Sequence, residues 1–157
     1  MIEIRCDENW DELIDLPKIR NILIIFLKHL FSGEHGISLY LTDDAEIQKL
    51  NKEFRDKDGP TDILSWTYAE DDPALQDAEI INSEEENFAG ELVVSVERVR
   101  QQSVENGWNF ETELIRLLAH GCAHLADLDH ERSAEEAHEM LELEITLLNE
   151  VGLTNIY

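Results

Sequence analysis

Apolar and polar residues follow two periods along this chain, and each period predicts a type of element. Short apolar or alternating runs such as GISLYL and ELVVSV favour β-strands. Longer segments in which apolar residues recur every three or four positions favour helices that bury one face. The pattern predicts strands at residues 2–6, 36–41, 63–67 and 91–96, and helices at residues 17–31, 43–54, 97–105, 111–125 and 133–150.

Local signals mark where several of these helices begin. Pro17 suits a first helical turn, because the amide hydrogen that proline lacks is not needed there. Thr42 is the expected N-cap of the second helix, and Ser133 with Glu136 gives the last helix a capping box. The acidic stretch 70–87 shows neither period, and we expect an irregular loop or a hairpin excursion there.

The whole chain, residues 1–157, is expected to form one globular α/β domain. Its 157 residues are 43% hydrophobic, enough for a sizeable core, and the helix at 111–125 is apolar around most of its circumference, which predicts a central position. No apolar run reaches the roughly 18 residues of a membrane span, and the start MIEIRCDENWDE lacks a signal-peptide core. Two cysteines, Cys6 and Cys122, make no disulfide framework. We therefore expect a cytoplasmic protein with no membrane partner.

The strongest chemical signal is the spacing of His120, His124 and His130 in the run HGCAHLADLDH. On a helix the first two lie one turn apart on the same face, and a chain reversal after Leu125 would return the third. Three imidazoles plus a water are a usual donor set for a hydrolytic Zn²⁺ site, although they also suit other divalent ions. Packing or surface roles for all three are disfavoured by their spacing and by the small residues between them. The other histidines are interpreted as ordinary: His29, His35 and His138.

The same run departs from the zinc peptidase motif H-E-x-x-H at an informative place. The glutamate of that motif is the general base for peptide hydrolysis, and this chain has Gly121 instead. The longer metzincin motif places glycine where this chain has Asp127. A metal hydrolase that acts on something other than peptides is the better interpretation. Cys122 projects away from both helical histidines, and we expect a small buried core residue rather than a ligand.

The charge distribution bears on the substrate. The chain has 36 acidic and 12 basic residues, a net charge of −24, which disfavours non-specific binding to phosphates. Four of the bases, Lys49, Lys52, Arg55 and Lys57, lie within nine residues. They form either a local positive patch on an acidic body or the solvated face of a helix.

Three motifs resemble those of one family. HGCAHLADLDH is similar to the signature of the YbeY-type endoribonucleases, the ribosomal-RNA maturation factors, which reads approximately H-G-x-L-H-L-x-G-Y-D-H. LNKEFRDKDGPTDILSW resembles that family's L-N-x-x-(Y/F)-R-x-K-D-x-P-T-D-V-L-S-F, and AGELVVS is close to its L-G-D-I-V-I-S strand. Met140 to Glu144 fits its C-terminal M-x-x-x-E. The motifs occur in family order and span nearly the whole chain.

The resemblance implies an αβα domain with a mixed sheet of about four strands around the histidine-bearing helix. It implies one divalent metal ion, most simply Zn²⁺, held by His120, His124 and His130. The implied activity is single-strand-directed endoribonuclease, used in rRNA maturation and ribosome quality control. By position in the motifs, the catalytic residues are Arg55 and His120.

The residues themselves suggest a mechanism for such a site. A bound metal polarises a phosphate oxygen or activates a water, and the Arg55 guanidinium holds phosphate oxygens and stabilises developing charge. Lys52 and Lys57 would help to hold the RNA backbone. Thr61 and Asp62 are expected to fix the loop before the third strand. The alternative for Arg55 is a surface ion pair with one of the many acids.

Two departures from the family pattern lie in the histidine run. Asp127-Leu128 replaces Gly-Tyr, and Ala123 replaces a leucine. Aspartate tolerates a left-handed turn better than most residues do, so we expect metal binding to survive. Asp129 is expected either to orient a ligand histidine or to cap the turn. Two other functions remain open: a ribosome-associated assembly factor with little catalysis, whose acidity suits basic ribosomal proteins, and a metallopeptidase, which Gly121 disfavours.

Overall fold

Four strands form one mixed sheet. The computed structural model describes residues 2–31, 35–55, 61–66, 88–126, 133–154 and 156. The strand order is β1-β2-β4-β3. Neighbours β1 and β2, and β2 and β4, run parallel, while β3 is antiparallel to β4. The strands span Ile2–Cys6 (β1), Gly36–Thr42 (β2), Ile63–Trp66 (β3) and Phe88–Ser95 (β4).

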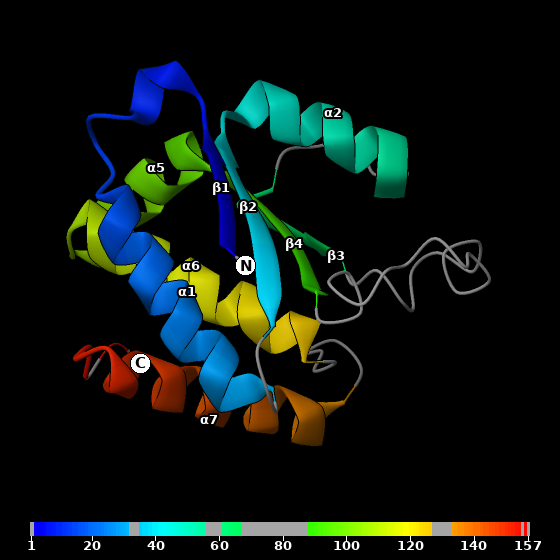
Figure 1. Ribbon diagram of the computed structural model, residues 1–157, viewed down its shortest axis with the longest axis vertical. Helices are drawn as coiled ribbons and strands as arrows, with labels where there is room; N and C mark the ends of the chain where they lie inside the picture. Colours follow the sequence, from blue (N-terminus) through cyan, green and yellow to red (C-terminus); the bar gives the residue numbers. More distant parts are fainter. Residues whose placement is uncertain are drawn as a thin grey trace.

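Helices cover both faces of this sheet. Helices α1, α6 and α7 lie on one side and α2 on the other, with α5 following β4 (Figure 1). This arrangement confirms the predicted αβα fold with a mixed sheet. The helices span Leu16–Leu30 (α1), Asp44–Arg55 (α2), Val96–Asn106 (α5), Phe110–Leu125 (α6) and Ala134–Glu150 (α7), and a 3₁₀ turn, η1, spans Glu8–Trp10. Among the helices that the structure describes, none has the length and apolarity needed to cross a membrane.

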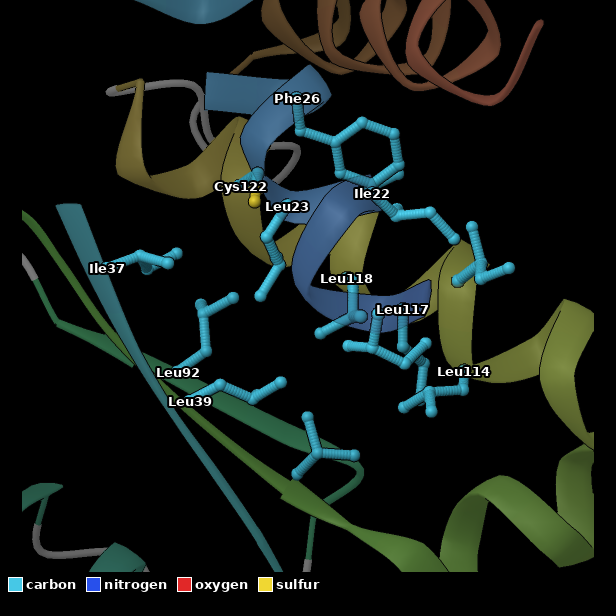
Figure 2. Close-up of a cluster of buried hydrophobic side chains, with 14 of the residues drawn as sticks. Ile22, Leu23, Phe26, Ile37, Leu39, Leu92, Leu114, Leu117, Leu118 and Cys122 are labelled. Atoms are coloured by element: carbon cyan, nitrogen blue, oxygen red, sulfur yellow. The ribbon is translucent and has the colours of Figure 1, made fainter. Parts of the chain in front are cut away.

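The main core lies between the sheet and helices α1 and α6. Alternate strand residues such as Leu39 and Leu92 point into it and meet Phe26 and Leu118 from the helices (Figure 2). A smaller cluster on the opposite face joins Ile47 of α2 to the sheet. Helix α6 packs against α1, α5, α7 and the sheet, so it occupies the central position that its apolar circumference predicts.

One helix boundary differs from its prediction because two neighbouring polar residues can both cap the helix. The predicted N-cap of α2, Thr42, is wrong by one residue. Thr42 ends β2 and its hydroxyl donates to Asp7 Oδ2 at 2.7 Å, while Asp43 Oδ1 accepts from the amide of Glu46 at 2.8 Å and caps the helix. The prediction for Ser133 is confirmed at the N-cap, since its Oγ accepts from the amide of Glu136 at 3.0 Å.

Strand β4 begins earlier and ends earlier than predicted. It includes Phe88, Ala89 and Gly90, and Val96 already belongs to α5 because the Oγ of Ser95 caps that helix. Ile37 of β2 pairs with Gly90 while the preceding residue pairs with Phe88, so Ala89 is an extra residue in a bulge. The expected loop or hairpin at 70–87 lies outside the described residues.

Candidate active site

Helix α6 places two of the predicted ligands side by side. The helix begins at the N-cap Asn109, whose side chain accepts from the amide of Thr112 at 2.8 Å. One turn apart near its other end, the rings of His120 and His124 have centroids 4.8 Å apart and planes at 87°. Both side chains are partly exposed, whereas Ala123 between them is buried. The pair therefore stands at the edge of the core, with its rotamers limited by packing.

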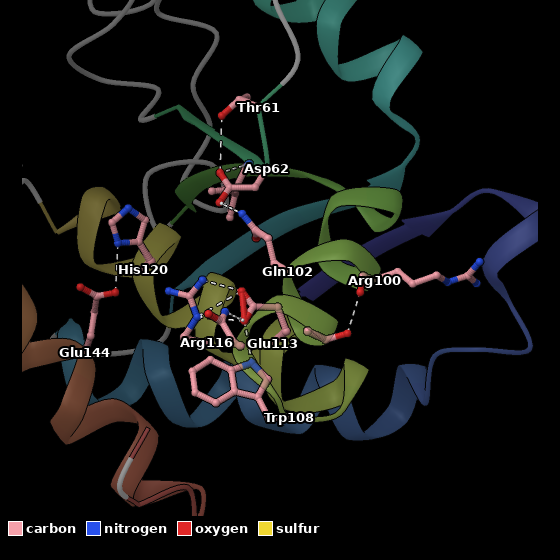
Figure 3. Close-up of polar contacts among 12 residues, drawn as sticks. Thr61, Asp62, Arg100, Gln102, Trp108, Glu113, Arg116, His120 and Glu144 are labelled. Atoms are coloured by element: carbon pink, nitrogen blue, oxygen red, sulfur yellow. Dashed lines mark hydrogen bonds and ion pairs between the residues drawn. The ribbon is translucent and has the colours of Figure 1, made fainter. Parts of the chain in front are cut away.

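A buried carboxylate from another helix contacts the first of these histidines. Nδ1 of His120 lies 3.0 Å from Oε1 of Glu144, which comes from α7 (Figure 3). The Glu144 side chain is 6% exposed and that of His120 is 24% exposed. A carboxylate oxygen only accepts hydrogen bonds, so this contact is a hydrogen bond when Nδ1 carries the proton, which leaves Nε2 as the nitrogen for a metal. Carboxylates hold metal-ligating histidines in this way in many metal sites.

The third predicted ligand, His130, lies outside the described residues, as does Asp129. Within the described part of the chain, no group of three His, Cys, Asp or Glu residues comes together as a metal site. The metal and its complete ligand set therefore stay predictions. The chemistry of the two described donors fits a divalent transition metal, because neutral imidazoles suit such ions and a carboxylate orients one of them.

Gly121 has a structural reason to lack a side chain. A Cβ at this position would lie 2.7 Å from Cδ1 of Ile63 and 2.9 Å from Cδ2 of Leu92, so this side of α6 rests on the sheet. A glutamate at position 121 would have to displace these side chains from the α6–sheet contact. The geometry agrees with the interpretation that the peptidase base is absent.

The region of the predicted phosphate-binding residues is described only in part. Arg55 is the last residue of α2, but its side chain lies outside the described part of the structure, and so does all of Lys57. Lys49 and Lys52 are exposed on α2. The structure thus fixes where the main chain of Arg55 lies and leaves its proposed role a prediction.

Asp62 fixes the start of β3, as predicted. Its Oδ1 accepts from the amide of Ile63 at 2.8 Å, and its Oδ2 accepts from Nε2 of Gln102 at 3.3 Å (Figure 3). Its carbonyl oxygen accepts from the amide of Ser95 at 2.9 Å. The hydroxyl of Thr61 lies 3.4 Å from Oδ1 of Asp62. These bonds tie Asp62 and the start of β3 to β4 and α5.

Both cysteines are unsuited to metal binding or nucleophilic chemistry at neutral pH. Burial raises the pKa of the Cys122 thiol to about 12, and the side chain lies in the main core, as predicted. Burial and a hydrogen bond with Asp11 raise the pKa of Cys6 to about 11. Thiols with such pKa values stay protonated at pH 7.

The remaining histidines have local partners. Nδ1 of His29 lies 3.0 Å from Glu150 Oε1, and Nε2 of His138 lies 3.1 Å from Glu142 Oε1 on an exposed helix face. His35 stacks on Phe31 with ring centroids 4.9 Å apart. These contacts agree with their interpretation as ordinary residues.

Comparison with known proteins places the chain in a family. Its residues 6–152 match the family model described as Endoribonuclease YbeY. The chain belongs to the YbeY family. A relative named endoribonuclease YbeY in Clostridioides difficile strain 630 is 37% identical, over 92% of this chain and 89% of its own length. One of that name in Desulfitobacterium hafniense strain Y51 is 38% identical, over 78% of this chain and 75% of its own length.

A solved structure supports the same placement. The solution structure of TM1509 from Thermotoga maritima matches with a TM-score of 0.59 and 26% identity, and the match covers 96% of this chain and 91% of that one. The family model and the named relatives confirm the resemblance inferred from the motifs. Sequence reasoning missed the contact between Glu144 and His120. The one sequence signal for this contact is the M-x-x-x-E motif, which by itself assigns no role to the glutamate.

Proposed function

We propose that this chain is a metal-dependent endoribonuclease that cleaves single-stranded RNA in rRNA maturation and ribosome quality control. Membership of the YbeY family carries this proposal, because the relatives that match most of the chain are named endoribonucleases. The pairing of His120 and His124 on one face of α6, with Glu144 behind the first ring, supports it. In this proposal His130 completes the ligand set and Zn²⁺ is the ion.

The residues would divide the chemistry among them. When bound, the ion supplies a Lewis acid that polarises a phosphate oxygen or lowers the pKa of a water to about 7. His120 and His124 hold it through ring nitrogens. The Arg55 guanidinium donates to the phosphate oxygens and stabilises the charge that develops on them. Lys52 and Lys57 bind the flanking backbone, and Asp62 holds the start of β3 in place.

The decisive experiment compares variants on one labelled single-stranded RNA. We expect the Zn²⁺-loaded wild type to cleave it and double-stranded RNA to remain largely intact. His120→Ala and Arg55→Ala should each lower the rate about 100-fold or more, since the first removes a metal ligand and the second removes the group that contacts the reacting phosphate. Lys28→Ala, which removes an exposed base on α1, is the control and should cleave normally.

Metal dependence is tested on the same substrate. Treatment with a chelator should abolish cleavage, and added Zn²⁺ should restore it in the wild type but not in His120→Ala. Equal, slow cleavage by the wild type and all variants would instead identify a contaminating nuclease and contradict the proposal.

A second function is favoured by one observation, the net charge of −24. An assembly factor that binds basic ribosomal proteins would use this acidity directly, with little or no catalysis. If this second function is correct, the wild type and His120→Ala should bind ribosomal subunits equally well, and neither should cleave RNA. A metallopeptidase remains disfavoured, because the side of α6 at Gly121 faces the sheet.

A further inference from the structure

The inference concerns a charged residue on the buried face of α7. Four positions of that helix are buried at helical spacing: Met140, Glu144, Leu147 and Leu148. Three of them are apolar and continue the core between α7 and α6. Glu144 is only 5% exposed and occupies a position where another leucine would pack with no charge to desolvate. A buried carboxylate lowers stability unless its partners compensate for the lost hydration.

One partner of this carboxylate is a ring nitrogen of His120. Glu144 Oε1 lies 3.0 Å from Nδ1 of His120 (Figure 3), and the helices that carry these residues, α7 and α6, pack against each other. A histidine side chain in water favours the tautomer with its proton on Nε2. The carboxylate reverses this preference, because it can only accept and so requires the proton on Nδ1. Rotation of the ring about its Cβ–Cγ bond would break the same hydrogen bond.

We propose that Glu144 is a positioning residue that holds His120 as the Nδ1–H tautomer, with Nε2 turned toward the predicted metal. The inference rests on the proposed metal site for its purpose, but the tautomer itself is a property of the metal-free protein. Glu144 makes the imidazole a stronger ligand in two ways: it fixes the orientation of the ring, and its negative charge increases the electron density on Nε2. Burial of the Glu144 carboxylate lowers the stability of the fold, and the same carboxylate orients the His120 ring.

The first readout uses no metal and no RNA. The ¹⁵N chemical shifts of the His120 ring at pH 8, above the usual titration range of imidazole, should identify the Nδ1–H tautomer in the wild type. In Glu144→Leu the ring should revert toward the Nε2–H tautomer. The leucine continues the stripe formed by Met140 and Leu147, so this variant should fold with a melting temperature at or above that of the wild type. Glu144→Gln keeps the shape of the side chain without its charge.

The second readout is metal affinity, measured by competition with a chromogenic chelator. Glu144→Leu should bind Zn²⁺ about 10- to 100-fold more weakly than the wild type, and Glu144→Gln should fall between them. Glu139→Gln is the matched control, an exposed glutamate of the same helix whose removal changes the net charge equally. It should leave both the tautomer and the affinity unchanged.

The outcomes separate this inference from the proposed function. An Nε2–H tautomer in the wild type, or an unchanged tautomer in a folded Glu144→Leu, overturns the positioning role. An altered tautomer with unchanged Zn²⁺ affinity also overturns it, since the ring orientation would then not serve the metal. Absence of nuclease activity in a protein that shows the expected tautomer and affinity contradicts only the nuclease assignment.

Discussion

At the scale of single residues, glycines show where the main chain comes too close for a side chain. Gly90 has φ of 155°, and a Cβ there would lie 2.2 Å from the carbonyl oxygen of Trp66, a main-chain atom of the adjacent strand. Gly107, at the C-cap of α5, has φ of 77° with open space around it. The first glycine is required by contact with a neighbour, and the second only by its backbone conformation.

We expect Gly90→Ala to be among the most destabilising single substitutions in the chain. The rigid carbonyl of Trp66 cannot move without separating β3 from β4, so the free energy of unfolding should fall by about 2–4 kcal/mol. Gly107→Ala carries only the strain of a left-handed alanine, about 1 kcal/mol. Urea unfolding of both variants measures the difference. Equal losses of unfolding free energy in the two variants would show that the close contact between the Trp66 carbonyl and position 90 does not determine the cost of Gly90→Ala.

At the scale of elements, the junction between α5 and α6 is organised by a buried carboxylate. Oε2 of Glu113 accepts from the indole Nε1 of Trp108 at 2.7 Å and from Nδ2 of Asn106 at 3.1 Å (Figure 3). The side chain of Arg116 pairs with the same carboxylate. Glu113 is completely buried. Its network joins the end of α5 to the first turns of the helix that carries His120.

Glu113→Ala should therefore lower the free energy of unfolding by about 3–5 kcal/mol, because it removes a buried acceptor shared by a partly buried indole and an arginine. Glu113→Gln should lose less, since an amide oxygen still accepts from Trp108. Glu111→Ala is the control, a glutamate of the same turn whose ion pair with Lys18 is exposed, and it should change stability little. Similar urea midpoints for the two alanine variants would contradict the importance of burial here.

The sequence predicts these elements well because periodicity reports burial. Strand β2 and helix α6 keep the predicted type and nearly the predicted bounds, since each has a clear apolar pattern. The prediction fails by one residue at Thr42, where Thr42 and Asp43 are both good capping residues. A hydrogen bond to Asp7, which directly follows β1 and lies 35 positions before Thr42, decides between them. No local pattern contains that information.

The candidate site, too, has features that local sequence predicts and features that only the packing of helices determines. The spacing of His120 and His124 predicts their shared face, because helix geometry alone determines it. The contact of Glu144 with His120 depends on how α7 packs on α6, 24 positions away in sequence. The motif predicts that a glutamate is present, but only the packing shows what it touches. Arg55 and His130 remain predictions from motifs.

At the scale of the whole molecule, charge is distributed unequally between helices α7 and α2. Helix α7 carries six glutamates and no lysine or arginine, whereas α2 has three acidic and three basic residues. The two helices lie on opposite sides of the sheet (Figure 1). A polyanion such as RNA is therefore repelled by the molecule as a whole, and less strongly at α2, the helix that ends at Arg55, than at α7. The acidity of α7 would direct the substrate away from that helix.

This distribution predicts an unusual dependence of RNA cleavage on salt. Near 0.01 M ionic strength the Debye length is about 30 Å, so RNA meets the field of the full net charge of −24; near 0.1 M it is about 10 Å, and only nearby groups are felt. We expect kcat/KM for single-stranded RNA to rise over this range and to fall at higher salt, as contacts between phosphates and bases are screened. For a basic nuclease, rates would fall throughout. The measurement uses initial rates at constant Zn²⁺, with sucrose of equal osmolarity as the control. A steady decrease from the lowest salt would mean that contacts between the RNA phosphates and the bases of α2 outweigh the repulsion from the rest of the protein.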